Sequence, residues 1–214
     1  MKLINNTQFK LIKRASDENE EPSIAINDIS LETRTIDFRA EINELSAGFL
    51  IKALTFLDNL SNKPIKINFS SPGGDVISGL AVYDTIRSLR SQVEIYACGK
   101  VMSMGFIIFL AADHRDSSPN TCFMMHSILY AIPDDRSVKS HEAEVIESKR
   151  LNQVLINIMG ERTKKPKSWW YRKIQSLVDC YLTRDEAVEY GIVKIKPKGV
   201  KRTNGTKKVI KKGR

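Results

Sequence analysis

The sequence predicts a layered α/β domain built on a largely parallel sheet. Residues 65–90 and 93–112 each show an apolar β-type run, a short turn and a helical apolar pattern. Strand and helix that alternate in this way are typical of parallel α/β architecture. The composition agrees, because 42% apolar and 28% charged residues, with only 11 Gly and 7 Pro in 214, are those of a globular protein.

The apolar periodicity also places the remaining elements. The two repeated units are read as strand 65–69, turn 70–74 and helix 75–90, then strand 93–98, turn 99–102 and helix 103–112. The second helix is apolar all round, so we expect it to be enclosed on every side. The other expected elements are strand 35–42, helix 46–60, strand 122–132, long helix 140–159 ended by Gly160, helix 168–178, helix 185–190 ended by Gly191, and strand 192–195.

The net charge of +9 is concentrated at the carboxyl end. Residues 194–214 carry ten Lys and Arg and no acid, which leaves a net charge of −1 on residues 1–193. Blocks of like charge usually form solvated tails. We therefore expect a mobile amino-terminal segment at 1–30, one folded domain at 31–195 and a disordered basic tail at 196–214, with no nucleic-acid binding by the domain.

The cysteines and the hydropathy indicate the compartment. Cys98, Cys122 and Cys180 lie among apolar residues and lack C-x-x-C spacing, which favours reduced thiols in a cytosol-like compartment over disulfides or zinc. No run of 18 apolar residues and no secretory signal pattern is present. The sequence predicts no membrane association, no metal and no cofactor.

Ser103 is the candidate nucleophile, because it opens the apolar helix 103–112. Unpaired N–H groups and the helix dipole favour developing negative charge at such a position. The glycine-containing turn at 71–74 precedes the neighbouring helix and can direct a second N–H group to the same point. Two converging donors form an oxyanion hole, in which each donor is worth roughly 3–4 kcal/mol.

A serine nucleophile needs a base, usually a histidine that a carboxylate orients. His114 and His141 lie in polar surroundings, where we expect them to be solvated. His126 lies in an apolar run, which fits a base and a buried structural histidine equally well. Asp179 stands between apolar residues, where an unpaired charge is costly, although a turn or capping role fits it as well.

Six short segments stand out in their order along the chain. They are SPGG at 71–74, AVYDTI at 81–86, SMG at 103–105, Met125-His126, Asp179 and EAVEYG at 186–191. Together they resemble ClpP, the proteolytic subunit of the Clp protease. Each motif alone is weak, but their order and separation over residues 35–193 make the resemblance strong.

The resemblance implies a ClpP/crotonase-type fold of strand-turn-helix units with a protruding long helix. It implies that Ser103 is the nucleophile, His126 the general base and Asp179 its orienting acid. Gly74 and Met104 would supply the oxyanion-hole N–H groups. The implied activity is that of a serine endopeptidase, which hydrolyses unfolded polypeptides inside a ring-shaped chamber.

The same resemblance implies partners. Two stacked heptameric rings are expected, joined by the helix at 140–159, as a homo-oligomer or as a hetero-oligomer with paralogues. A separate Clp-type AAA+ ATPase would supply unfolding, because the chain contains no GxxxxGK[ST] motif. The implied location is the cytoplasm, the plastid stroma, or the host cytoplasm if a phage encodes the chain.

The sequence departs from the family pattern at several positions. Val101-Met102 precedes the serine where the family usually has alanines, and residues 127–133 replace the usual Gln-Pro and glycine-rich strand after the histidine. A catalytically weak or silent ring subunit that supports active paralogues is therefore an alternative. Acyl-thioester chemistry on the related crotonase scaffold is a third reading, which coenzyme A binding would favour.

Overall fold

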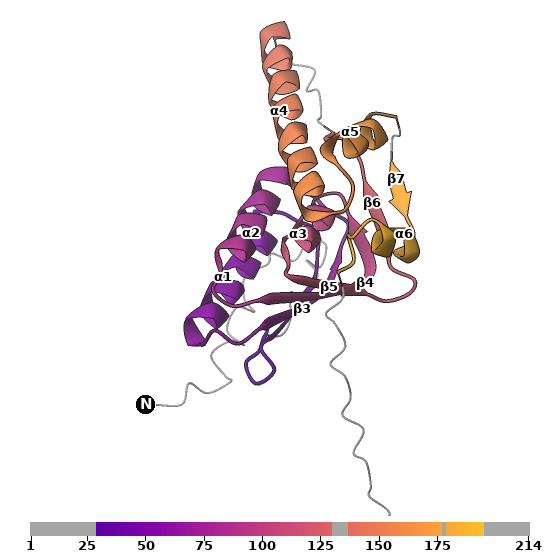
Figure 1. The fold of residues 1–214 in the computed structure, drawn as a ribbon. Helices are drawn as coiled ribbons and strands as arrows, with labels where there is room; N and C mark the ends of the chain where they lie inside the picture. The colour runs from indigo at the N-terminus through magenta and orange to yellow at the C-terminus, as the bar shows by residue number, and fades with distance from the viewer. Residues whose placement is uncertain (1–28, 130–136, 177–178, 195–214) are drawn as a thin grey trace, which may run out of the picture.

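The structure, a computed structural model, describes residues 29–129, 137–176 and 179–194 (Figure 1). Ile29 and Ser30 form the first strand, so the sheet begins inside the segment expected to be mobile. The remainder of that segment and the whole of the expected basic tail lie outside the described residues.

One seven-stranded sheet forms the centre of the molecule, and the predicted parallel arrangement is confirmed. The strand order is β1-β2-β3-β4-β6-β7, with β5 paired to β4 as a branch. The pairs β2–β3, β3–β4, β4–β5 and β4–β6 are parallel, and only the edge strands β1 and β7 pair antiparallel. The strands are β1 Ile29–Ser30, β2 Thr35–Arg39, β3 Ile65–Ser71, β4 Val93–Met102, β5 His114–Ser117, β6 Cys122–Met125 and β7 Cys180–Leu182.

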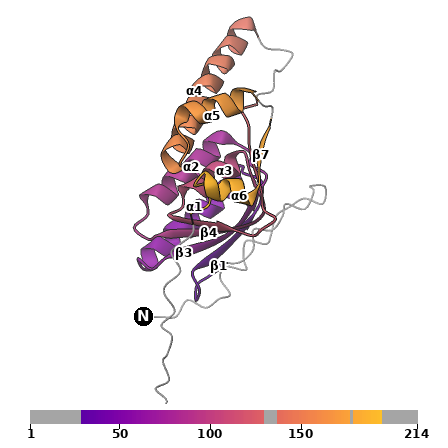
Figure 2. The same ribbon diagram turned by 45° about the vertical axis from the view of Figure 1, so that its right-hand side comes forward.

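Three helices cover one face of this sheet, and a fourth extends away from it. In both ribbon views α1, α2 and α3 lie side by side against the strands, and the first half of α4 protrudes beyond the rest (Figures 1 and 2). The protruding helix predicted from the sequence is thereby confirmed. The helices are α1 Glu44–Leu60, α2 Val76–Ser88, α3 Met104–Ala111, α4 Val138–Arg162, α5 Lys167–Ser176 and α6 Arg184–Glu189.

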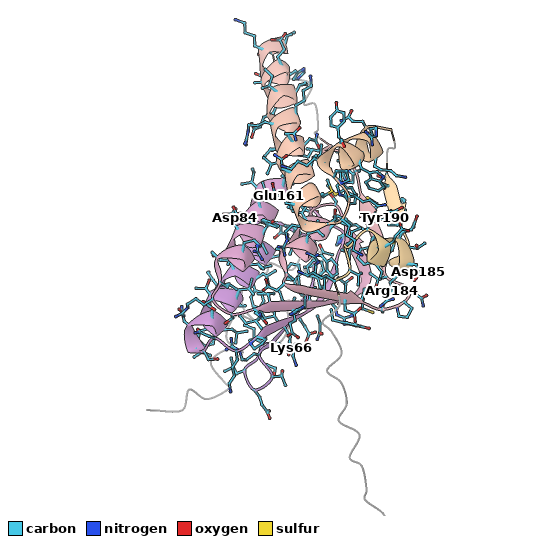
Figure 3. The ribbon with its side chains drawn as sticks, viewed as in Figure 1. Lys66, Asp84, Glu161, Arg184, Asp185 and Tyr190 are labelled. Carbon is cyan, nitrogen blue, oxygen red and sulfur yellow. The ribbon has the colours of Figure 1, made fainter. Side chains whose placement is uncertain are left out.

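The two faces of the sheet differ in polarity. In β3 the residues facing the helices, such as Ile65, Ile67 and Phe69, are buried, whereas Lys66 between them is exposed on the other face (Figure 3). Burial of alternate residues is what a half-covered strand requires. The helix-covered face therefore holds the core, and α3 lies within it with all eight of its residues buried.

Strand β4 is longer than predicted. It continues through residues 99–102, which the sequence indicated as a turn, and ends at Met102. Gly99 adopts a φ of +92° inside the strand, and the register between β3 and β4 shifts between Phe69 and Ser71. The glycine therefore marks an irregularity in the ladder rather than its end.

Gly160 was expected to end the long helix, and that expectation is wrong. Helix α4 continues to Arg162 and is closed by Thr163, whose N–H donates to Met159 O. A Cβ on Gly160 would lie 2.4 Å from Lys167 Cγ and 3.0 Å from Lys167 N. The glycine is thus explained by the close approach of α5, since no larger residue leaves room for it.

The carboxyl-terminal end of the domain also differs from the expectation. Residues 192–195 were read as a strand, but within the described residues only Lys194 pairs, in a single antiparallel bridge with Arg115. The strand on that side is β5, which the sequence reading missed. Arg184 lies at the start of α6 (Figure 3). It donates hydrogen bonds to this strand, to Asp116 Oδ1 at 3.2 Å and to Ser117 O at 3.1 Å.

Arginine side chains bind the carboxyl end of α3. Arg162 from α4 donates to Leu110 O at 2.9 Å and Ala112 O at 2.8 Å. The buried Arg115 donates to Leu110 O at 2.7 Å and also to the carbonyl oxygens of Arg162 and Gly191. Burial lowers the pKa of Arg115 to about 10, which leaves it cationic at neutral pH. Cations at this end match the helix dipole and fix α3 in position.

Candidate active site

Ser103 occupies the sharp turn between β4 and α3. Its backbone has a φ of 49° and a ψ of −123°, a conformation rare for any residue other than glycine. Its N–H donates to Met124 O at 2.9 Å, which attaches the turn to β6. Its side chain makes no capping hydrogen bond to α3, so the hydroxyl is available for other chemistry. A strained strand-to-helix turn of this kind presents a nucleophile at the edge of a sheet.

The amino end of α3 supplies one N–H group beside Ser103. Met104 is the first residue of the helix and has no carbonyl one turn earlier to accept its N–H. Gly105 permits a close approach to β3, because a Cβ there would lie 2.9 Å from Ser71 Cβ. The amino end of α3 therefore packs directly against the end of β3.

The turn after β3 supplies a second N–H group. Ile42 N–H donates to Gly73 O at 2.7 Å, and Asp75 N–H donates to Ile42 O at 2.8 Å. This parallel bridge between Ile42 and Gly74 is formed by the Gly73 carbonyl and the Asp75 N–H. The Gly74 N–H itself takes no part in it. A Cβ on Gly73 would lie 2.6 Å from Ser103 Cβ, so this turn and the serine are in direct contact.

Asp75 holds the turn in place from its other side. Its Oδ1 accepts the N–H of Ser78 at 2.7 Å and caps α2. Hydrogen bonding from the Ser78 side chain, and then from the Ser78 N–H, lowers the pKa of Asp75, because it stabilises the carboxylate form. The sequence therefore specifies the turn twice, through its glycines and through this helix cap.

His126 lies immediately after β6 rather than inside a long strand. The strand expected at 122–132 ends at Met125, and residues 130–132 lie outside the described residues. The ring is half-buried, and its Nδ1 is 2.5 Å from Ser127 O. His126 also lines a cavity.

The structure gathers four of the five predicted site residues around that cavity. Its volume is about 240 Å³, and Ser103, His126, Gly74 and Met104 all line it. Among the described residues, its lining carries no ionisable side chain apart from His126, so an extended apolar group can enter this part of the cavity without desolvating a charge. The described lining residues are Pro72, Gly74, Val76, Ser103, Met104, Met125, His126, Ile128, Leu129 and Leu155.

Asp179 is the predicted site residue that does not line the cavity. It was expected in costly apolar surroundings, but it is exposed, so that expectation is wrong. The register of the β6–β7 ladder nevertheless places Asp179 next to His126. Met125 pairs with Cys180 in the antiparallel β6–β7 ladder, and the next pair of positions is His126 and Asp179.

The other two histidines are neither at the cavity nor fully solvated. His114 lies in β5 instead of at a helix end, and His141 lies in the first turns of α4. Both were expected to be solvated, but both are half-buried, and each has one buried ring nitrogen without a partner among the described residues. Of the three histidines, His126 is the one that lines the cavity together with Ser103.

Sequence reasoning missed the contribution of α4 to the site. Leu155 lines the cavity, and Asn152 accepts the Ile128 N–H at 2.9 Å. The helical stripe that contains Leu155 was visible in the sequence, but nothing local indicated what it would contact. Within the described ranges, no cluster of three His, Cys, Asp or Glu side chains is arranged to hold a metal ion.

The comparisons with known proteins agree with this geometry. The Clp protease family model matches residues 18–195. The chain belongs to the Clp protease family. It is 31% identical over 198 residues to the ATP-dependent Clp protease proteolytic subunit 2 of Treponema denticola, an alignment that covers 90% of this chain and 94% of the relative.

Two further Clp protease comparisons support the assignment. The proteolytic subunit 2 of Pseudomonas aeruginosa is 31% identical over 168 residues, with 77% of this chain and 81% of that protein covered. The solved structure of a ClpP1 point mutant from Listeria monocytogenes is 32% identical, with a TM-score of 0.69 over 76% of this chain and 90% of that chain. The ClpP/crotonase-type fold expected from the sequence is therefore confirmed.

Proposed function

We propose that this Clp family member is a serine endopeptidase that hydrolyses unfolded polypeptides. Ser103 acts as nucleophile, His126 as general base, Asp179 as the group that orients the imidazole, and Gly74 and Met104 as oxyanion donors. The observation that carries the proposal is the single cavity that Ser103, His126 and the two backbone donors line together.

The reaction follows from these positions. Ser103 Oγ attacks the peptide carbonyl carbon while His126 accepts the hydroxyl proton. The same imidazole returns that proton to the leaving amine as the C–N bond breaks, which leaves an acyl group on the serine. Water, deprotonated by His126, then attacks the acyl carbon. The imidazole returns this proton to Ser103 Oγ as the bond between Oγ and the acyl carbon breaks, which releases the acid and the free serine.

The two backbone N–H groups stabilise the charge that forms in each tetrahedral intermediate. The oxyanion lies between the Gly74 and Met104 N–H groups, which the bridge and the helix leave unused. Fixed donors of this kind contribute roughly 3–4 kcal/mol each. The α3 dipole adds to the same effect, because its positive end faces the cavity.

The imidazole has two possible orienting partners. A neutral ring whose Nδ1–H donates to Ser127 O leaves the Nε2 lone pair free to accept a proton. Asp179, at the next register position, takes over this role if the ring turns away from the backbone carbonyl. Either arrangement selects the tautomer that the mechanism requires.

Assembly into two stacked heptameric rings, with a separate Clp-type ATPase, belongs to the same proposal. The protruding half of α4 supports it, since Val138 and Ile146 on that helix are 73% and 68% exposed and offer apolar area to another subunit. We place the enzyme in the cytoplasm, where its three cysteines, Cys98, Cys122 and Cys180, would remain free thiols. None of the helices in the described ranges combines the length and hydropathy needed to span a bilayer.

Hydrolysis by the assembled protein tests the proposal. We expect the wild-type oligomer, sized by analytical ultracentrifugation, to cleave a fluorescent unfolded polypeptide, and Ser103→Ala to assemble equally but cleave at the background rate. One observation favours the alternative of a silent subunit: Asp179, the proposed orienting acid, is exposed. No cleavage by assembled wild type, with cleavage regained only after a paralogue is added, would establish that alternative.

A further inference from the structure

Asn152 connects helix α4 to the segment that carries His126. Its Oδ1 accepts the backbone N–H of Ile128 at 2.9 Å, two residues beyond the histidine. A backbone N–H can only donate, so the side-chain atom at this distance is the carbonyl oxygen. The contact is partly buried and joins residues 24 positions apart in the chain.

This hydrogen bond lies just beyond the point where the chain stops pairing in the sheet. Strand β6 ends at Met125, and residues 126–129 follow outside any strand. In the part of the chain that the structure describes, no other hydrogen bond ties residues 126–129 to a neighbouring element. Among the described contacts, the Asn152 bond is therefore the hydrogen bond that joins the backbone after His126 to another element.

Helix α4 also forms part of the cavity wall next to this bond. Leu155 lies one turn after Asn152 on the same face of the helix. It is 2% exposed and lines the cavity together with Ile128 and Leu129. Helix α4 thus contributes both a wall residue of the cavity and the hydrogen bond that holds the segment beside it.

We propose that Asn152 is a positioning residue, which holds residues 126–129 so that His126 faces Ser103. The inference rests on the proposed function, because it assigns Asn152 to the geometry of that reaction. Proton transfer requires the imidazole within hydrogen-bond reach of Ser103 Oγ. A displacement of about 1 Å at such a group can reduce the rate roughly a hundredfold.

Three variants of α4 separate positioning from packing. Asn152→Leu has nearly the same shape without an acceptor, whereas Asn152→Asp keeps an acceptor oxygen. Gln153→Leu makes the same kind of change at the adjacent exposed position, where the glutamine bonds only to Asn157 among the described residues. Each variant is compared with wild type as the assembled oligomer, in kcat, in KM and in hydrogen exchange at the Ile128 amide.

We expect Asn152→Leu to lower kcat by roughly tenfold to a hundredfold with KM changed little, since the cavity wall remains. Its Ile128 amide should exchange faster, and Asn152→Asp and Gln153→Leu should resemble wild type in kcat and exchange. Wild-type kcat in an Asn152→Leu oligomer whose Ile128 amide exchanges faster would overturn the inference and leave the proposed function intact. An inactive wild-type oligomer would overturn the proposed function, and this inference with it.

Discussion

Replacing His126 with alanine should slow peptide hydrolysis by roughly 10⁴- to 10⁶-fold, because loss of the base leaves Ser103 protonated and weakly nucleophilic. Ser103, Met104 and Gly74 would still line the cavity, so binding of a short peptide should change far less than kcat. The measurement is kcat and KM for a fluorogenic peptide, with the assembled oligomer confirmed on the same sample.

The matched control is His141→Ala on helix α4. His141 is half-buried like His126, but it does not line the cavity. We expect this variant to keep kcat within a few fold of wild type. If both variants lost activity equally, or if His126→Ala stayed active, the assignment of His126 as the base would be wrong.

A Gly74→Ala substitution should be nearly as damaging. The added Cβ would lie 2.1 Å from Ile42 O, and the residue would have to keep a φ of +140°. Both effects displace the turn and with it the oxyanion donor, so we expect kcat to fall roughly 10²- to 10³-fold. Strain at such a backbone conformation should also cost roughly 1–3 kcal/mol in the free energy of unfolding.

Gly48→Ala is the control for this substitution. Nothing lies within 4 Å of a Cβ at Gly48, which is inside α1 and away from the cavity. Alanine in a helix interior should raise stability by about 1 kcal/mol and leave kcat unchanged. A Gly74→Ala oligomer with wild-type kcat would contradict the role of the turn.

The sequence predicted the core of the fold because its signals there are local. The apolar helix after Ser103 and the glycines of the turn at 71–74 encode their own conformations, and the structure places both at one cavity. Strand lengths were predicted less well, since partners decide them. Strand β4 reaches ten residues beside three neighbours, and β6 stops at Met125, opposite Cys180, the first residue of its three-residue partner β7.

The missed parts of the site depend on contacts between distant residues. No local pattern marks Asn152 as the acceptor for Ile128, and Gly160 looked like a helix end because the approach of α5 cannot be read from its neighbours. Asp179 was assigned apolar surroundings from adjacent residues, although β7 places it at an exposed position. In each case the contacts of the residue are determined by tertiary packing, which cannot be inferred from the neighbouring sequence.

Reaction of the assembled protein with a fluorophosphonate, followed by mass spectrometry of its peptides, tests directly whether Ser103 is the nucleophile. We expect one adduct per subunit, located on Ser103, and none in Ser103→Ala. The rate of adduct formation should fall in His126→Ala, because the same base activates the serine toward this reagent. An adduct that persists in Ser103→Ala, or an assembled wild-type protein that forms none, would contradict the assignment of Ser103 as the nucleophile.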